Sequence, residues 1–477
     1  MLFQTLHYAI FLILIVGMYW SSPHRYRLHI LGGASIIFYG SWNLNYVPLL
    51  VGVALLAWGL GRIFSKARRP DAPQWLFGIA LATLFVPLAI FKYWDWVVET
   101  ITAVLAWGGI SVELPRRDDY NIILPIGISF FTFQAASYLV DVRKNGEEEN
   151  NPWRFVSFLA FFPQLIAGPI VRQHELLPQL KKPLLLDRDD LGEALFRITK
   201  GLVKKLVFAD LLYHSIIEQT FADPMTYRGI ELWVALYAYT IWIYYDFSAY
   251  TDIAIGSAKL FGITLPENFN RPYQSSSVAE FWRKWHITLS NWVRDYIYFP
   301  LGGTRTDKVW KSYRNIIITM VVIGIWHGAS WNFVIYGTLH GSAVAFNRWQ
   351  RKSTGRMPGE AFKNKLSWFW RFLLTFHFVV IARILFGTKS IVDAWDYLLG
   401  LGDLEWVLPR FYSPLPFAVL VLGYAWHFTP REWTDERIKS FFISLPTPAK
   451  AFVVAISTLL CWQLTKNAPI AFAYYEF

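Results

Sequence analysis

The feature that most limits how this chain folds is a succession of apolar segments, each close to the length that crosses a lipid bilayer. The first, residues 6–20, contains no Lys, Arg, Asp or Glu, and no Lys or Arg precedes it. A cleaved signal peptide needs a basic start and a small-residue cleavage site, so we expect this segment to remain as a membrane span. At about 20 residues for each spanning helix, the chain has room for roughly ten to twelve spans.

Further apolar segments predict the remaining spans. They are a stretch that ends at residue 42 and residues 46–64, 75–96, 120–140, 155–171, 202–217, 232–247, 315–346, 366–386, 411–428 and 451–464. We therefore expect an all-α polytopic membrane protein in which roughly 11 helices span or re-enter the membrane. Pro87, Pro125 and Pro163 lie inside three segments and predict kinked or broken helices. No internal repeat or long hinge divides the chain, so residues 1–477 are interpreted as one membrane domain.

Composition and charge agree with a membrane protein. Hydrophobic residues make up 55% of the chain and charged residues 17%, whereas soluble proteins average about 45–50% and about 25%. The net charge of +11 would suggest nucleic acid in a soluble protein, but here basic residues gather in alternate loops, at residues 21–29 and 65–74. The positive-inside rule places these loops in the cytoplasm and the N-terminus outside. Because this accounts for the positive charge, we expect no nucleic-acid partner. The single cysteine, Cys461, excludes a disulfide framework and a multi-cysteine metal site within one chain.

The first candidate for chemistry is a histidine inside an apolar segment. His327 lies within residues 316–336 and alone interrupts the apolar and glycine residues from 320 to 328. Ionisable side chains at membrane depth are costly, which favours a functional role. The alternative is an interhelical hydrogen bond. His340 would fall on a different face of a straight helix and ranks behind it.

A second candidate is the stretch of residues 281–299, which predicts an amphipathic helix when the residues are placed at about 100° each. One face would carry Arg283, His286, Ser290 and Arg294. The opposite face would be aromatic. Such a helix lies at the interface or re-enters the membrane, with its cationic face toward a water-filled cavity. The alternative is a surface helix anchored by its tryptophans.

Charged residues form a third candidate. Asp246 and Asp252 interrupt an aromatic and aliphatic run, and buried carboxylates need partners, which Arg or His of residues 281–299 are available to supply. Lys204 and Lys205, with Lys200, stand at the mouth of a predicted span. They are either a topology signal or a landing site for a phosphate-bearing cofactor from the cytoplasm. The sequence lacks the short motifs of phosphate-binding loops, zinc proteases, serine hydrolases and dinucleotide-binding folds.

Two long stretches carry a family resemblance. Residues 266–303 (PENFNRPYQSSSVAEFWRKWHITLSNWVRDYIYFPLGG) and 324–341 (GIWHGASWNFVIYGTLHG) resemble the membrane-bound O-acyltransferase (MBOAT) family, in its bacterial alginate O-acetylase branch. Further matches lie at residues 123–142, 161–172, 201–205 and 244–256. The resemblance implies an MBOAT fold around a central pore or funnel, with a catalytic core at about residues 120–350.

The resemblance also implies the activity. Members of the family move an acyl group from a thioester to a hydroxyl, and the histidine of their WHG motif, here His327, is treated as catalytic. The second polar position falls on His286. In this branch the donor is cytoplasmic acetyl-CoA, used as a substrate, with no bound cofactor or metal implied. The acceptor is an envelope or exported polysaccharide such as alginate. A periplasmic serine-esterase-like acetyltransferase commonly completes the transfer, and the protein resides in the bacterial inner membrane with a periplasmic N-terminus.

A mechanism follows from these expectations. His327 is the predicted general base, because imidazole titrates near neutral pH. His286 would donate to the thioester oxygen or orient the acceptor. Substrate contacts are predicted for Asp246, Asp252, Arg283, Asn291, Arg294, Trp326, Lys204 and Lys205. The alternatives are D-alanyl or other acyl transfer to a teichoic acid, peptidoglycan, lipid or protein hydroxyl, a non-enzymatic transporter, and a non-catalytic scaffold.

Overall fold

The computed structural model describes the whole chain except residues 121, 228, 356–364, 404–413, 466–471 and 473–477. The described residues form helices and no β-strand, so the all-α prediction is confirmed. They divide into two compact units: unit 1 holds residues 1–194 and 254–266, and unit 2 holds residues 195–253 and 267–477. Two of the three boundaries fall inside helices, within α9 (Arg188–Val203) and α11 (Gly229–Lys259), and the third follows Pro266, outside any helix. That residues 1–477 form one membrane domain stays a prediction.

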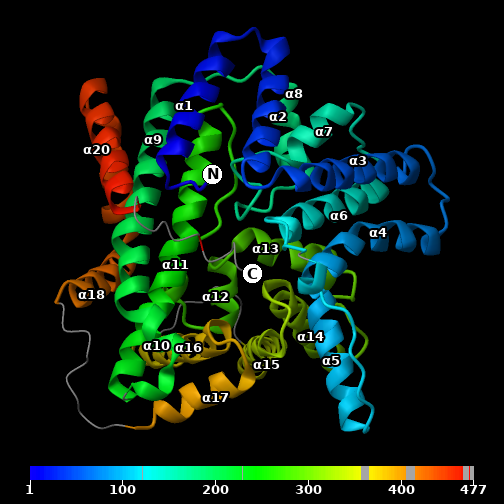
Figure 1. Cartoon of the computed structure of the whole chain (residues 1–477), viewed down its shortest axis with the longest axis vertical. Helices are drawn as coiled ribbons and strands as arrows, with labels where there is room; N and C mark the ends of the chain where they lie inside the picture. The colour runs from blue at the N-terminus through cyan, green and yellow to red at the C-terminus, as the bar shows by residue number, and fades with distance from the viewer. Residues whose placement is uncertain (121, 228, 356–364, 404–413, 466–471, 473–477) are drawn as a thin grey trace. The chain divides into compact units, whose positions relative to one another are not determined.

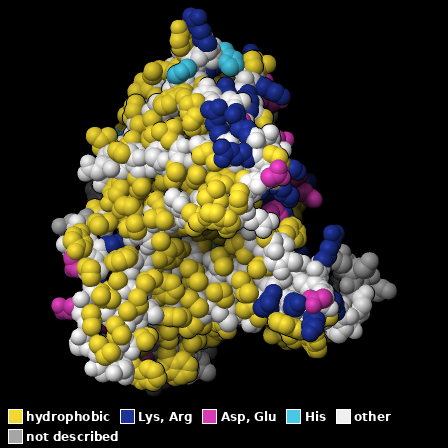
Figure 2. Space-filling view, turned by 90° about the vertical axis from the view of Figure 1, so that its right-hand side faces the viewer, with side chains coloured by type: hydrophobic (Ala, Val, Ile, Leu, Met, Phe, Trp, Pro, Cys, Tyr) yellow, Lys and Arg dark blue, Asp and Glu magenta, His cyan; other side chains and the backbone are white. Residues whose placement is uncertain are grey.

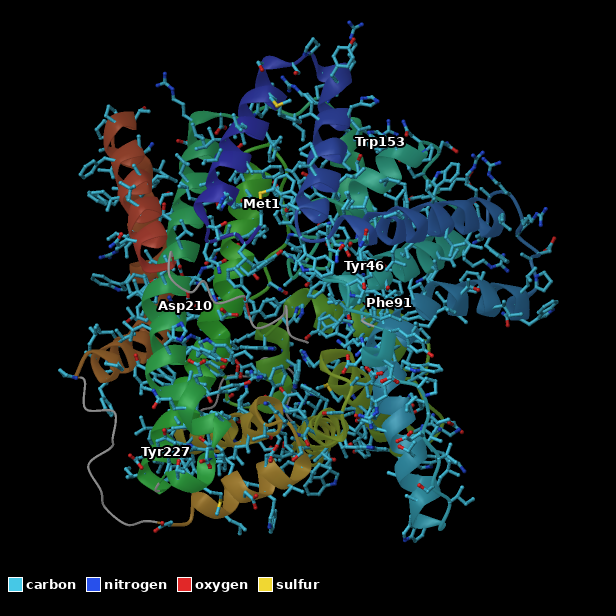
Figure 3. All side chains as sticks on the ribbon, viewed as in Figure 1. Met1, Tyr46, Phe91, Trp153, Asp210 and Tyr227 are labelled. Carbon is cyan, nitrogen blue, oxygen red and sulfur yellow. The ribbon has the colours of Figure 1, made fainter. Side chains whose placement is uncertain are left out.

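Unit 1 consists of a set of apolar helices packed through close contacts. Its helices are α1 (Leu6–Ser21), α2 (His24–Gly40), α3 (Val47–Phe64), α4 (Gln74–Leu88), α5 (Trp94–Trp107), α6 (Ile128–Asn145), α7 (Pro152–Leu159) and α8 (Gln173–Lys181). Helices α3 and α6 lie side by side (Figure 1), and Gly61 of α3 leaves room for the buried ring of Tyr138 of α6. Tyr46 and Phe91, labelled in Figure 3, meet edge to face with ring centroids 5.8 Å apart. The absence of a side chain at Gly61 thus sets how closely α3 and α6 pack.

Unit 2 contains the histidine-bearing segments. Besides the end of α9 and most of α11, its helices are α10 (Glu218–Ala222), α12 (Val278–Lys284), α13 (Ile287–Val293), α14 (Val309–His327), α15 (Trp331–Thr354), α16 (Lys365–Gly387), α17 (Ile391–Gly400), α18 (Pro414–Phe428), α19 (Ile438–Ser444) and α20 (Thr447–Thr465). Wider π-helical turns occupy Lys204–Asp210, Tyr213–Ile217, Arg294–Tyr298 and Glu432–Arg437. Such turns recur at functional sites.

Several helices have the length and composition of membrane spans. Among the described residues, Leu44–Phe64, Gln74–Trp107 and Leu366–Gly387 are long and apolar enough to cross a bilayer, and Leu6–Ser21, Pro414–Phe428 and Thr447–Leu460 are shorter apolar helices. Hydrophobic side chains cover wide areas of the face shown in Figure 2, and Trp107 is 93% exposed. Exposed apolar surface of this extent suits contact with lipid. The count of roughly 11 membrane helices stays a prediction.

Proline and glycine account for the places where the helices differ from the predicted spans. Pro87 lies inside α4 and does not end it: a π-helical segment, Ala89–Tyr93, follows α4 directly and the helical run continues into α5, so whether the helix kinks at Pro87 stays a prediction. The span predicted at residues 155–171 is wrong, since α7 ends at Leu159 and the chain then runs without a regular helix past Pro163. Proline cannot continue a helical hydrogen-bond ladder, which explains this early end.

The segment predicted as one span at residues 315–346 is a hairpin of two helices, α14 and α15, that lie side by side (Figure 1). Glycines allow the close approach. A Cβ added to Gly337 would lie 2.5 Å from the carbonyl oxygen of Met320, and one added to Gly341 would lie 2.9 Å from the Cα of Ile317. The hairpin positions His327 at the end of its first helix.

Replacing Gly337 by alanine is expected to destabilise this hairpin. The added methyl group overlaps the backbone of α14, and overpacking of this kind costs about 1–3 kcal/mol in the free energy of unfolding. Thermal unfolding of the purified protein in detergent measures the loss. The control is Gly52→Ala in α3, where no atom lies within 4 Å of the added Cβ and alanine favours the helix. Equal melting of Gly337→Ala and the unchanged protein would contradict the close packing.

Candidate active site

His286 occupies a strained backbone position between two short helices. Its φ of 43° and ψ of 57° are left-handed, and only Arg271 among the other described non-glycine residues has a positive φ. This conformation breaks the chain into α12 and α13, so the prediction of one continuous amphipathic helix over residues 281–299 is wrong. Left-handed residues cost free energy and tend to cluster at functional sites.

The side-chain amide of Asn268 contacts the ring of His286. The Oδ1 atom of Asn268 lies 3.0 Å from His286 Nδ1 and accepts hydrogen bonds from the backbone N–H (3.2 Å) and the hydroxyl (2.9 Å) of Thr288. Because the backbone N–H can only donate, the Asn268 atom facing this group is its oxygen, and His286 Nδ1 therefore carries a proton. In the neutral ring the other nitrogen, Nε2, is then the proton-accepting atom.

His327 is the last residue of α14, where the chain leaves the helix through the extended Gly328. It is almost fully buried, at 1% exposure. The ring of Trp326 lies 5.6 Å from that of His286 and 5.1 Å from that of His327. Trp326 therefore stands in ring contact with both predicted catalytic histidines, which brings together three of the residues singled out in the sequence.

His340 lies on the second helix of the hairpin rather than on the helix of His327. Its Nδ1 accepts a hydrogen bond of 3.2 Å from the indole of Trp282, and its ring lies 4.3 Å from that of Tyr336. It is fully buried. These contacts give His340 a place in the packing between α12 and α15.

The cations that pair with Asp246 and Asp252 lie on α9 and on the π-helical segment that follows it. Lys204 reaches Asp252 at 2.7 Å and Lys205 reaches Asp246 at 2.7 Å. Lys205 also pairs with Asp210, which Figure 3 labels on this helical run. Arg197 and Lys200 complete the partners of Asp252. The prediction that Arg or His of residues 281–299 would pair with Asp252 is therefore wrong, because α9 runs beside it.

A recess opens beside the histidine segments, and we call it the arginine recess. Its volume is about 460 Å³. Its lining residues are Ala279, Trp282, Arg283, Ile287, Ser290, Asn291, Val293, Arg294, Tyr298, Ile316, Thr319, Met320, Ile323, Val344, Arg348 and Arg351. Four of these are arginines and none is Asp or Glu. One part of the wall is cationic and much of the rest is apolar.

Three of these arginines lie close enough to repel one another. Burial and the positive charges of Arg283 and Arg348 lower the pKa of Arg351. Arg294 differs, because it pairs with Asp295 at 2.8 Å. Like charges gathered without a carboxylate in the wall are typical of an anion-binding site.

The structure thus sorts the predicted site residues into three groups. His286, His327 and Trp326 form a buried ring cluster; Asp246, Asp252, Lys204 and Lys205 form ion pairs; and Arg283, Asn291 and Arg294 line the arginine recess. Sequence reasoning missed Asn268, Arg348 and Arg351. The two arginines, three residues apart at the end of a predicted span, are the signal that was available for them. Among the described residues no group of three or more His, Cys, Asp or Glu is placed to hold a metal ion.

Residues 86–388 match the family model of the membrane-bound O-acyltransferases (MBOAT). The matched range contains both candidate histidines and the whole arginine recess. The chain therefore belongs to this family and is a membrane-bound O-acyltransferase. The transporter and scaffold alternatives lose their support with this assignment.

Three relatives show how far the similarity extends. A probable alginate O-acetylase of Azotobacter vinelandii is 36% identical over 428 residues, which cover 87% of this chain and 81% of that protein. The peptidoglycan O-acetyltransferase of Helicobacter pylori is 34% identical over 403 residues, or 78% of this chain and 73% of that protein. The teichoic acid D-alanyltransferase of Bacillus subtilis is 28% identical over 297 residues, or 59% of this chain and 73% of that protein. The resemblance to the alginate O-acetylase branch is confirmed.

The hydrogen bonds of Asn268 predict a measurable effect. Asn268→Ala removes the shared acceptor of His286 and Thr288, and we expect it to lower the free energy of unfolding by about 1–3 kcal/mol and to reduce acyl transfer. Asn268→Asp retains an oxygen acceptor, and we expect it to keep more of the stability and more of the acyl transfer than Asn268→Ala. Thermal unfolding and transfer of a labelled acyl group are the measurements. If both variants behave like the unchanged protein, Asn268 does not hold the ring.

Proposed function

We propose that this protein is an O-acetyltransferase that moves an acetyl group from cytoplasmic acetyl-CoA across the bacterial inner membrane, for attachment to a hydroxyl of an exported or envelope polysaccharide. The observation that carries the proposal is the arginine recess, whose wall reaches both histidine segments. Ile287, the residue after His286, lines it, and so does Ile323, one helical turn before His327.

The chemistry of the arginine recess suits coenzyme A. The donor carries several phosphate charges at one end and a less polar arm that ends in the thioester. Guanidinium groups bind phosphate through paired, charge-assisted hydrogen bonds. We assign Arg283, Arg348 and Arg351 to the phosphates and the apolar wall, which includes Met320, to the arm.

The reaction joins the acceptor oxygen to the thioester carbonyl carbon and breaks the carbon–sulfur bond. In this proposal His327 takes the hydroxyl proton as the new bond forms and returns a proton to the departing thiolate. His286, with Nδ1 protonated toward Asn268, accepts a hydrogen bond through Nε2 from a second hydroxyl of the acceptor and so orients the reacting one. Asn291 lies in the wall of the recess and is the candidate amide donor to the oxyanion.

The proposed acceptor rests on the similarity to the relatives, and the proposed orientation in the membrane rests on the charge of the loops. Two of the relatives described above are named for O-acetylation of alginate or peptidoglycan, and both match more of this chain than the D-alanyltransferase does. This supports acetyl over D-alanyl transfer. Basic loops at residues 21–29 and 65–74 support a cytoplasmic side for those loops and a periplasmic N-terminus. A periplasmic serine-esterase-like acetyltransferase would complete the delivery to the polysaccharide.

The variant His327→Ala tests the catalytic assignment. Loss of a general base is expected to lower acetyl transfer by about 100-fold or more. The amount of protein in the membrane and its melting temperature report folding. Transfer of radiolabelled acetyl from acetyl-CoA by the purified protein, with its periplasmic partner, measures the activity. Full activity of a well-folded His327→Ala protein would remove His327 from the mechanism.

The variant Arg351→Gln tests the donor site. Removing one charge-assisted phosphate contact is expected to raise KM for acetyl-CoA by about tenfold with little change in kcat. Lys352→Gln is the matched control, because it removes a positive charge from the next residue of α15, which does not line the recess. An equal KM for the two variants would exclude the arginine recess as the binding site for the donor phosphates.

A further inference from the structure

A second recess in unit 2 has no role in the proposed acetyl transfer, and we call it the C-terminal recess. Its volume is about 120 Å³. It is lined by residues of α9, α11, the segment 267–271 and the segment 426–439. This last wall lies beyond residue 388, where the match to the family ends. The recess is therefore built partly from a region that the family assignment does not describe.

Charge distinguishes this recess from the arginine recess. Its wall contains six cations and four carboxylates, a surplus of two positive charges: Arg197, Lys200, Lys204, Arg271, Arg431 and Lys439, with Asp252, Glu267, Asp435 and Glu436. Four carboxylates would repel a polyanion such as coenzyme A. A surplus of two positive charges suits a ligand that carries a single phosphate group.

Most of these cations are already paired. Asp252 binds Arg197 and Lys204, and Asp435 binds Lys200 at 3.0 Å and Arg271 at 3.3 Å. Burial alone would raise the pKa of Asp435, but the charge and hydrogen bond of Lys200 hold it below its usual range. Among the described residues, Arg431 and Lys439 have no acidic partner. They are the cations available to a ligand.

A buried histidine is the second observation that indicates a ligand. His427 is 2% exposed and lines the recess, and neither of its ring nitrogens has a hydrogen-bond partner among the described residues. Tyr244 and Tyr273 hold the ring, at centroid distances of 4.6 Å and 5.3 Å. A buried polar group without a partner is costly, so a hydrogen-bonding group inside the recess would stabilise this arrangement.

Aromatic residues beside the recess favour a lipid as the source of that group. Trp426 lines the recess and is 37% exposed, and Trp433 and Phe441 are exposed on the segment that follows. The helices on either side, α18 and α20, are short and apolar. Cations next to exposed tryptophans are typical of the headgroup region of a membrane.

We propose that the C-terminal recess binds a phosphate group, with contacts from Arg431, Lys439 and His427, and that an anionic phospholipid headgroup supplies it. The charges of Arg431 and Lys439 neutralise the phosphate, and the buried imidazole hydrogen-bonds to an oxygen of the headgroup. The site is independent of the donor site, since the two recesses share no lining residue.

The experiment measures lipid binding directly on the full-length protein in nanodiscs. Native mass spectrometry counts phosphatidylglycerol retained against phosphatidylcholine. Arg431→Gln is expected to lower phosphatidylglycerol retention by about fivefold, the effect of one basic residue near an anionic headgroup. Arg437→Gln is the control, because it removes a charge from the same segment outside the recess, where Arg437 stacks on Trp433. Arg431 is exposed, so its replacement leaves the packing intact.

A second arm separates lipid from soluble phosphate and from the donor. Inorganic phosphate and glycerol 3-phosphate are titrated by thermal shift into the unchanged protein, Arg431→Gln and His427→Phe. If phosphate stabilises the unchanged protein but not the two variants, and phosphatidylglycerol is not preferred, the recess binds phosphate and its ligand is soluble rather than a lipid. Equal lipid retention and equal phosphate response in all proteins overturns the proposal. KM for acetyl-CoA is expected to be unchanged in Arg431→Gln, so the donor assignment is tested separately.

Discussion

Two buried ion pairs, Lys204–Asp252 and Lys205–Asp246, connect α11 to the helical run that continues α9, and unit 2 is arranged around this connection. Removing one member of such a pair leaves a buried charge and costs about 3–5 kcal/mol. The π-helical segment Lys204–Asp210 carries both lysines, so adjacent residues reach carboxylates that lie six residues apart on α11. Phe247, next to Asp246, packs against His286 at a ring distance of 4.8 Å. Helix α11 thus links its pairing with the helical run that continues α9 to the position of His286.

The two recesses of unit 2 differ in a way that separates their ligands. The arginine recess has no carboxylate in its wall and an apolar side, which together suit a polyanion with a long, weakly polar arm. The C-terminal recess mixes both signs of charge and leaves only a small positive surplus, which suits one phosphate. Both recesses carry a surplus of positive charge, and in our proposals the carboxylates of the C-terminal recess are what makes it unsuitable for the polyanionic donor.

Apolar runs predicted the helices well where no proline or strained residue intervened. The first three segments became α1, α2 and α3 with nearly the expected bounds, because an apolar run of this length in lipid must satisfy its own backbone hydrogen bonds. The prediction was wrong at residues 155–171 and 281–299. At the first, α7 stops before Pro163; at the second, the left-handed backbone of His286 breaks the helix. Hydrophobic periodicity carries no information about a single residue held in a rare conformation by a distant amide.

The sequence by itself determined the all-α class, the family and the histidines that merit attention, since these depend on composition and on local residue order. Only the tertiary structure decided which residues meet. It brought the ring of Trp326 into contact with those of His286 and His327, fixed the proton of His286 through Asn268, and gathered Arg283, Arg348 and Arg351 around one recess. It also paired Asp252 with α9 rather than with residues 281–299. The physical reason is that contacts between side chains far apart in the chain depend on how helices pack, and that packing is set by close approaches such as the one at Gly337.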